Sequence, residues 1–315
     1  MESAQAANRS TAAPARLKLR RAIGRYWMLY VLLAPLLLYY VIFCYLPMFG
    51  IVIAFQDYRA TRGVFGSEWV GFKHFAAFFS SEYLWRTVRN TLSISGLGLV
   101  FGFPAPILLA LMLNELRGGA FKKTVQTITY IPHFISVVVI VSIVMNFVST
   151  KGLINELLAL LGAEPIRYAS DPSLFYPVYV ISGIWQTIGW DSIIFLAALA
   201  GVAPELYEAA TIDGAKRLRR IWHVTLPGIA PTIALMLILR MGGIMSVGYE
   251  KIILMYNPGI YEKADVISTY VFRRGLSDGQ YSFAAAVGLF NSVVNFILLL
   301  AADRASKRLG QSGLL

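Results

Sequence analysis

The sequence predicts an all-α, polytopic membrane protein with six transmembrane helices. Of its 315 residues, 57% are hydrophobic and only 14% are charged, whereas a soluble domain carries roughly a quarter charged residues. Six apolar stretches are each about 20 residues long, the length that spans a bilayer as a helix. The basic residues lie between these stretches. A chain with so little polar material cannot cover a soluble fold, so we expect lipid to be its solvent.

Residues 1–25 are predicted to form a disordered, basic tail, because they are rich in Ala, Ser, Arg and Lys. The apolar run that follows, near residues 28–52, is long enough to span the membrane. A secretory signal peptide would instead have a short apolar core and a small-residue cleavage site. We therefore expect an uncleaved first helix, in which Cys44, the single cysteine, can form no disulfide within the chain.

Five further spans are expected, which gives a transmembrane domain over residues 26–303 and a C-terminal tail over residues 304–315. The spans lie near residues 90–113, 124–147, 174–199, 227–248 and 281–302. Prolines inside the second and third spans are tolerated where neighbouring helices satisfy the freed carbonyls. Residues 66–80 and 153–161 look amphipathic, and they either lie at the outer interface or pack over helix ends.

The distribution of charge predicts that both termini lie in the cytoplasm. With the N-terminus inside, the inner segments hold 16 Lys and Arg against 6 Asp and Glu, and the outer segments hold 11 against 10. Cytoplasmic loops carry the excess of Lys and Arg in membrane proteins. The net charge of +11 thus follows membrane topology. We expect no nucleic-acid partner, because no basic soluble face is present.

Catalytic and metal sites are not expected. His74, His133 and His223 are scattered and match no metal-binding spacing. No nucleophile and base are positioned together, which argues against a membrane-embedded enzyme. No cofactor motif is found, and the Walker A pattern of ATP-binding proteins is absent. Any ATP-derived energy must therefore come from a partner.

The inner loop over residues 200–226 carries the most informative pattern. Pro204 and Glu205 favour the start of a short helix, and Gly214 allows a bend into a second one. The second helix is basic on one side and apolar on the other, a shape that suits docking into a groove of a soluble partner. The alternative is a basic loop that only fixes topology, and the ordered pattern argues against it.

This loop resembles the EAA motif of permeases from binding-protein-dependent ABC importers. The family pattern is Glu-Ala-Ala, three residues, Gly, nine residues, then Ile-x-Leu-Pro. The matching residues are Glu208, Ala209, Ala210, Gly214, Leu226 and Pro227. Val224 stands where Ile is usual, and Asp213 before the glycine is typical of the sugar-importing branch. Segments 45–58, 65–72, 130–135 and 266–272 are similar to permeases for alginate, xylan or pectin fragments.

The resemblance implies a type I ABC importer permease fold in a bacterial cytoplasmic membrane. A second, different permease subunit would complete the pore, two ABC ATPase subunits would hydrolyse ATP, and an extracytoplasmic solute-binding protein would deliver an oligosaccharide. The EAA residues, including Asp213, would then couple the pore to the ATPase. Glu208 would face an arginine of the ATPase in a charge-assisted contact.

Candidates for the substrate path are polar and aromatic residues in or near the spans. Asp191 and Arg240 are the ionisable residues inside spans, and they either pair or line the cavity. Arg240 suits a uronate carboxylate through bidentate bonding. The other candidates combine aromatic faces with amide groups, as sugar sites do: Trp185, Gln186, Trp190, Tyr249, Asn291 and Asn295. Each has a plainer role as interface anchor or helix contact.

Two other functions remain as alternatives. An ion-coupled secondary transporter would show inverted repeats or broken midplane helices and has no use for an EAA loop. An ABC permease for a different small sugar or polyol would have the same loop, and the sequence separates it poorly from the oligosaccharide importers. Co-purification with an ATPase separates the first alternative from an ABC permease.

Overall fold

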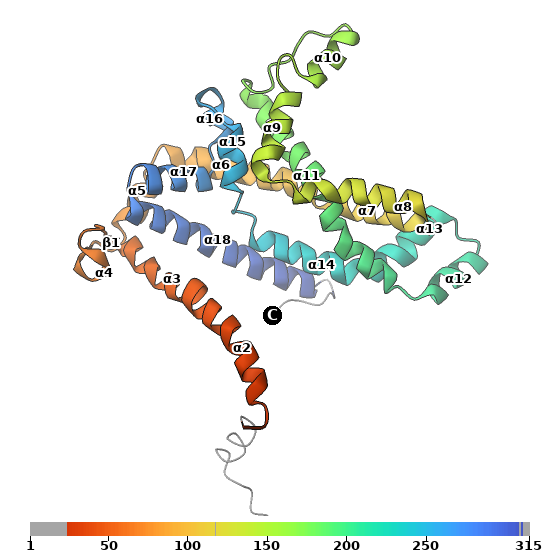
Figure 1. Ribbon diagram of the computed structural model, residues 1–315, viewed down its shortest axis with the longest axis horizontal. Coiled ribbons are helices and arrows are strands. Elements are labelled where there is room, and N and C mark those ends of the chain that lie inside the picture. Colours follow the sequence, from red (N-terminus) through yellow and green to blue (C-terminus); the bar gives the residue numbers. More distant parts are fainter. Residues whose placement is uncertain (1–23, 117, 309, 311–315) are drawn as a thin grey trace, which may run out of the picture. The chain divides into compact units, whose positions relative to one another are not determined.

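The computed structural model describes residues 24–116, 118–308 and 310, and these are mostly helical (Figure 1). The strands in this part are β1 (Gln56–Asp57) and β2 (Glu68–Trp69), which pair antiparallel with Gln56 opposite Trp69. The prediction of an all-α protein is thus confirmed. The chain divides into two compact units, Met1–Val52 and Ile53–Leu315.

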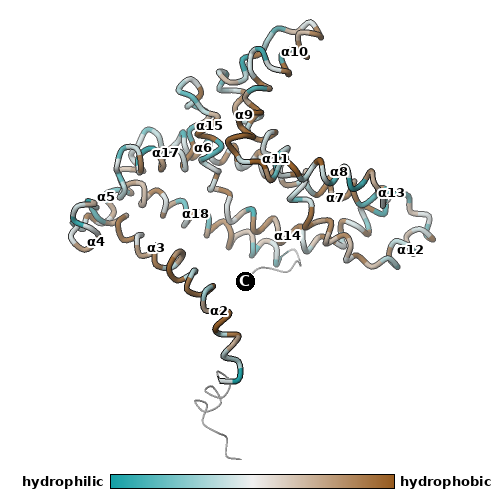
Figure 2. Tube along the Cα trace, viewed as in Figure 1, coloured by the Kyte–Doolittle hydropathy of each residue, from teal (hydrophilic) through white to brown (hydrophobic). Residues whose placement is uncertain are grey.

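The first unit holds most of a helical run that begins with α2 (Trp27–Tyr40). It continues through a π turn, Val41–Tyr45, into α3 (Leu46–Met48) and a 3-10 segment, Phe49–Phe55. The whole run, Trp27–Phe55, is apolar and long enough to cross a membrane (Figure 2). The proposed basic tail, apart from its last two residues, lies outside the described part of the chain.

The second unit contains four more helical runs with the length and composition of membrane spans: Tyr83–Glu115, Pro172–Ala200, Arg217–Gly242 and Tyr281–Arg308. Their main helices are α6 (Tyr83–Leu97), α7 (Pro104–Glu115), α11 (Phe175–Ala200), α14 (Leu226–Gly242) and α18 (Tyr281–Arg308). The shorter helices are α4 (Gly63–Gly66), α5 (Lys73–Phe79), α8 (Ala120–Tyr130), α9 (Val137–Phe147), α10 (Leu153–Leu160), α12 (Pro204–Ile212), α13 (Arg217–Arg220), α15 (Tyr249–Met255), α16 (Tyr261–Ala264) and α17 (Ile267–Phe272).

The expected straight span at 124–147 is broken in the structure. Helices α8 and α9 meet at an angle of 106°, with a 3-10 segment, Ile131–Phe134, before the bend. Pro132 has no N–H to continue the helix. Ser136 then caps α9, because its side chain accepts a hydrogen bond from the N–H of Val139. The chain therefore restarts a helix in a new direction, where hydropathy alone suggested one continuous segment.

Three other helix limits differ from the expected spans. Helix α6 begins at Tyr83, seven residues before the apolar stretch, because its polar first turns contact other parts of the fold. Helix α14 ends at Gly242, and residues 243–248 are not helical, so the fifth span ends earlier than expected. Helix α18 continues to Arg308, so the part of the expected tail before residue 309 is helical.

The long helices of the second unit pack along one another and along α8. Helix α11 lies along α7 and α8, and α14 lies along α18 (Figure 1). Gly189 of α11 makes the closest approach, since a Cβ atom there would lie 2.1 Å from the carbonyl oxygen of Thr129. Ile107, Phe195 and Ile229 form a buried cluster where α7, α11 and α14 meet. This cluster supports the end of the bundle from which α12 and α13 project.

A buried carboxylate joins three further parts of the same unit. Asp265 is fully buried and accepts hydrogen bonds from Nη2 of Arg86 and Nη2 of Arg273, both at 2.8 Å. Asn90 donates to the Asp265 carbonyl oxygen at 2.8 Å and accepts from the Tyr176 hydroxyl at 2.7 Å. This Asp265 cluster fixes α6 and α11 to the segment that contains α16 and α17.

Candidate functional site

Helices α12 and α13 form a bent helical hairpin, and Gly214 makes the bend. Gly214 has φ +74°, a conformation that costs a glycine little. The N–H of Ala215 donates to the Ala210 carbonyl at 2.9 Å, and that of Gly214 donates to Thr211 at 3.0 Å. These two bonds are the Schellman pattern that ends helices. Pro204 occupies the first turn of α12, where its missing N–H costs little.

Two side-chain bonds hold the hairpin closed. Nη1 of Arg220 donates to the Thr211 hydroxyl at 3.0 Å, which joins α13 to the last turn of α12. The Tyr207 hydroxyl donates to that of Thr225 at 3.2 Å, which joins α12 to the segment entering α14. These bonds connect the two helices to each other and to the base of α14.

The outer surface of the hairpin is exposed and mixes apolar with charged groups. Ile212 is 87% exposed, and Leu218 and Trp222 are also exposed. Glu208 is also exposed, and its carboxylate has no ion-pair partner in the described ranges. Arg217 pairs with Glu115 at the end of α7 at 3.1 Å. Exposed apolar side chains ringed by charge are what a helix docking into a partner's groove presents.

The remaining EAA positions lie at the ends of the same unit. Ala209 is exposed and Ala210 half-buried on α12, and Asp213 is the residue that ends this helix. Leu226 packs against the buried cluster at the base of α14, with Pro227 beside it in the first turn. The motif therefore covers the hairpin and its attachment to the bundle.

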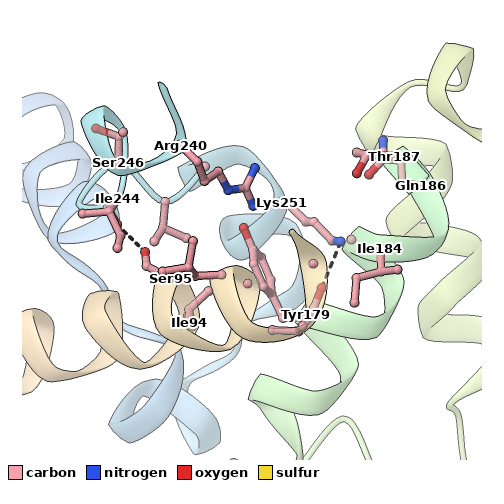
Figure 3. A pocket seen from close by; sticks show the side chains of 18 of the residues that line it. Ile94, Ser95, Tyr179, Ile184, Gln186, Thr187, Arg240, Ile244, Ser246 and Lys251 are labelled. Atoms are coloured by element: carbon pink, nitrogen blue, oxygen red, sulfur yellow. Dashed lines mark hydrogen bonds between the residues drawn. The ribbon is translucent and has the colours of Figure 1, made fainter. Parts of the chain in front are cut away.

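A second candidate site is a cavity of about 500 Å³ between α6, α11, α14 and α15 (Figure 3). Figure 3 shows the side chains of Tyr179, Arg240 and Lys251 converging on one part of it. The cavity also has hydroxyl, amide and carboxylate groups in its lining, which come from Ser95, Gln186, Thr187, Asp191 and Ser246. Such a mixture of polar groups in a cavity suits a hydrophilic ligand.

The two cations of the cavity are held differently. Arg240 is exposed and forms no ion pair with Asp191 among the described residues, although both line the cavity. Lys251 is only 8% exposed, and its Nζ donates to the Tyr179 carbonyl oxygen at 3.2 Å. Burial lowers the pKa of Lys251 to about 8, because desolvation penalises the charged form. The expected alternative of an Asp191–Arg240 pair is not what the structure shows.

The three aromatic candidates lie outside the cavity lining. Trp185 lines a separate apolar pocket of about 350 Å³ between α9, α10 and α11. Trp190 stacks on His133, with ring centres 4.5 Å apart and an interplanar angle of 2°. Tyr249 stacks on Phe272 at 5.4 Å. Trp190 and Tyr249 thus pack on other rings, and none of the three is among the residues that line the cavity.

The two asparagines of α18 also lie outside the cavity lining. Asn295 accepts from the N–H of Met245 and donates to the Ser246 hydroxyl, both at 2.9 Å. It therefore holds in place the turn after α14, which does line the cavity. Asn291 is half-buried, and its Oδ1 has no hydrogen-bond partner in the described part of the chain.

Of the eight predicted residues, the cavity thus brings together Gln186, Asp191 and Arg240. Sequence reasoning missed Tyr179 and Lys251. Lys251 was counted among the charges of an outer loop, and the signal was the short apolar run that follows it, Ile252 to Met255. Tyr179 is one of several aromatic residues in its span, and the sequence offers no signal that separates it from the others.

Comparison with known proteins places the chain in a family. A family model described as "Binding-protein-dependent transport system inner membrane component" matches residues 102–311, more than half of the chain. The chain belongs to this family. Protein LplB of Bacillus subtilis is 48% identical to it, over 93% of this chain and 92% of that protein. A polygalacturonan/rhamnogalacturonan transport system permease protein of the same organism, YteP, is 46% identical over 91% and 89%.

Solved structures show the same fold. One is a bacterial alginate ABC transporter in complex with an alginate pentasaccharide-bound periplasmic protein. A chain of it is 45% identical, with a TM-score of 0.87, and the match covers 94% of this permease and all of that chain. The type I ABC importer permease fold is therefore confirmed. At this identity the likeness extends to the family as well as to the fold.

The chain is accordingly a permease subunit of an ABC importer and a multi-pass protein of the inner membrane. It is a transport subunit, and a separate ATPase hydrolyses the ATP. Membership of this family implies ATPase and substrate-binding protein partners. The alternatives of a secondary transporter and of a membrane enzyme are both excluded by the family assignment.

Proposed function

We propose that the permease imports acidic oligosaccharides through the cavity between α6, α11, α14 and α15. The single observation that carries the proposal is the charge of this cavity, which is lined by two cations, Arg240 and Lys251, and by one carboxylate, Asp191. Two similar proteins are named for acidic sugar chains: the polygalacturonan/rhamnogalacturonan permease and the alginate transporter. Anionic cargo is what a cavity with an excess of positive charge favours.

Arg240 is the first residue that this proposal places in contact with a substrate carboxylate. Its Nη2 lies beside Gly98, where a Cβ atom would be 3.6 Å away, and both residues line the cavity. The planar fork of an arginine matches a carboxylate with two parallel hydrogen bonds. Because the guanidinium has no ion-pair partner among the described residues, a uronate carboxylate displaces no internal salt bridge on binding.

Arg240→Gln is expected to weaken import of acidic oligosaccharides while leaving neutral ones unaffected. A hydrogen bond to a charged group contributes roughly 1.5–3 kcal/mol, which corresponds to a rise in KM of roughly tenfold to a hundredfold. The measurement is ATP-dependent uptake of an oligogalacturonide into liposomes that contain the complete transporter and its binding protein. The control is Arg304→Gln, an exposed arginine of α18 outside the cavity. Uptake of neutral but not acidic oligosaccharides by the wild-type transporter contradicts the proposal.

The same proposal includes the arrangement of the complex. Both termini lie in the cytoplasm, as the excess of Lys and Arg in the corresponding loops supports. The α12–α13 hairpin then faces the ATPase subunits, and Glu208 contacts an arginine of one of them. A second, different permease completes the pore, as the resemblance to importers of complex oligosaccharides supports. ATP-driven closure of the ATPase pair moves the hairpin as a rigid body and switches the pore between two states.

A further inference from the structure

Lys251 is a buried cation without a counter-ion. Its side chain is 8% exposed, and its Nζ makes one hydrogen bond, to the Tyr179 carbonyl at 3.2 Å. The ammonium also lies 4.9 Å from the centre of the Tyr179 ring. No carboxylate lies within ion-pair distance of it in the described ranges. A buried charge costs free energy unless it is paired, so this lysine needs a reason beyond packing.

Packing of α15 does not supply that reason. Ile252 and Met255 already fix this helix, because both are buried in the cluster it shares with α9 and α11. Helix α9 carries no ionisable side chain, and α17 carries only Tyr270. From α11 and α14, the ionisable groups around the cavity are Tyr179, Asp191 and Arg240. An apolar residue at position 251 would bury the same surface without the desolvation cost of an ammonium.

Lys251 is one of the residues that line the cavity. Gly183 of α11 lines the cavity, and a Cβ atom there would lie 3.5 Å from Nζ of Lys251. A lysine ammonium has three N–H donors, and Tyr179 accepts one of them. Arg240 has the same arrangement with Gly98. Each cation therefore lies beside a glycine of a neighbouring helix, with donors left over for a ligand.

We propose that Lys251, together with Arg240, binds the carboxylates of the transported sugar chain and determines the preference of the permease for acidic over neutral oligosaccharides. This inference rests on the proposed function and names the residue that gives it charge selectivity. The arginine offers a planar fork, and the lysine offers a compact point charge with rotatable donors. A uronate carboxylate supplies the counter-ion that the fold lacks.

The first test compares Lys251→Met and Lys251→Arg with the wild type in the reconstituted transporter. The substrates are a short oligogalacturonide and its methyl ester, which has the same length but no charge. For Lys251→Met we expect KM for the acid to rise about tenfold, with KM for the ester unchanged. Lys251→Arg keeps the charge and restores import of the acid. Comparing each variant with the wild type on the same substrate removes the contribution of the binding protein.

The second test measures the affinity for the acidic substrate as a function of pH. If Lys251 had only a structural role, the wild type and Lys251→Arg would show the same pH dependence. The pKa of Lys251 is lowered to about 8, so its charge is lost as the pH rises through that value, while the carboxylates of the sugar stay ionised. Wild-type affinity for the acid should therefore fall above about pH 8. The Lys251→Arg variant should keep its affinity there, because arginine remains protonated.

The outcomes separate the inference from the proposed function. Equal loss of acid and ester import in Lys251→Met, with no change in the pH profile in Lys251→Arg, means that Lys251 only anchors α15 and overturns the inference. Unchanged acid import in Lys251→Met also overturns it, while the proposed function stands. Failure of the wild-type transporter to import the acid at all instead overturns the proposed function itself.

Discussion

Glu208→Lys is expected to abolish ATP-dependent uptake while the permease remains inserted in the membrane. The carboxylate of Glu208 is exposed on α12 and has no ion-pair partner among the described residues, so the substitution removes no internal contact. It places a cation where the proposed ATPase arginine approaches. Like charges across an interface cost several kcal/mol, so we expect uptake to fall roughly a hundredfold or more.

The measurement is uptake into proteoliposomes, together with recovery of the ATPase on the purified permease. Glu68→Lys is the matched control, because Glu68 is an exposed carboxylate in β2 and lies far from the hairpin in the sequence. This control should transport as the wild type does. Normal uptake by Glu208→Lys would remove Glu208 from the coupling contact.

Asp265→Ala is expected to cost about 3 kcal/mol of stability. Removing one partner of a buried ion pair costs roughly 3–5 kcal/mol, because the other charge stays buried without compensation. The side chains of Arg86 and Arg273 are both 29% exposed and can regain some water, which places the effect at the lower end of that range. Asn90 of α6 donates a hydrogen bond to the backbone carbonyl of Asp265 and accepts one from Tyr176 of α11. A shift of the Asp265 backbone should therefore loosen α6 and α11 together.

Thermal unfolding of the purified permease in detergent measures this effect as a lower midpoint. Asp278→Ala is the control, since Asp278 is 40% exposed and pairs with Arg274 four residues before it, at 3.3 Å. Exposed pairs of this kind contribute about 0.5 kcal/mol or less. An Asp265→Ala midpoint equal to that of the control would show that the Asp265 cluster does not carry the fold.

Hydropathy was sufficient to locate the long helices of this protein, because length and apolar content are local properties. It was not sufficient at Pro132, where a broken segment and a straight span have the same composition. The start of α6 was also missed. Arg86 belongs to this helix, but its charge lies outside the apolar stretch from which the span was located. Its partner, Asp265, is 179 residues away in the sequence, and a single sequence does not reveal such a pairing.

The hairpin was easier to predict than the cavity. Its features are local, since Pro204 begins a helix and Gly214 bends the chain within ten residues. The cavity is formed by residues of four helices, so its members depend on packing that the sequence does not show. Arg240 was found because a charge in an apolar stretch stands out. Lys251 was missed because residues 249–255 were placed in an outer loop, whereas they form α15.

Photo-crosslinking from Ile212 tests the central claim, that the α12–α13 hairpin engages an ATPase, most directly. A photoreactive residue replaces Ile212, which is exposed on the hairpin, and a second variant carries it at Phe65, which is exposed in α4. In an actively transporting complex, the account predicts an adduct between the permease and the ATPase from position 212 and none from position 65. An active transporter in which position 212 gives no ATPase adduct, or reacts with the solute-binding protein, would contradict it.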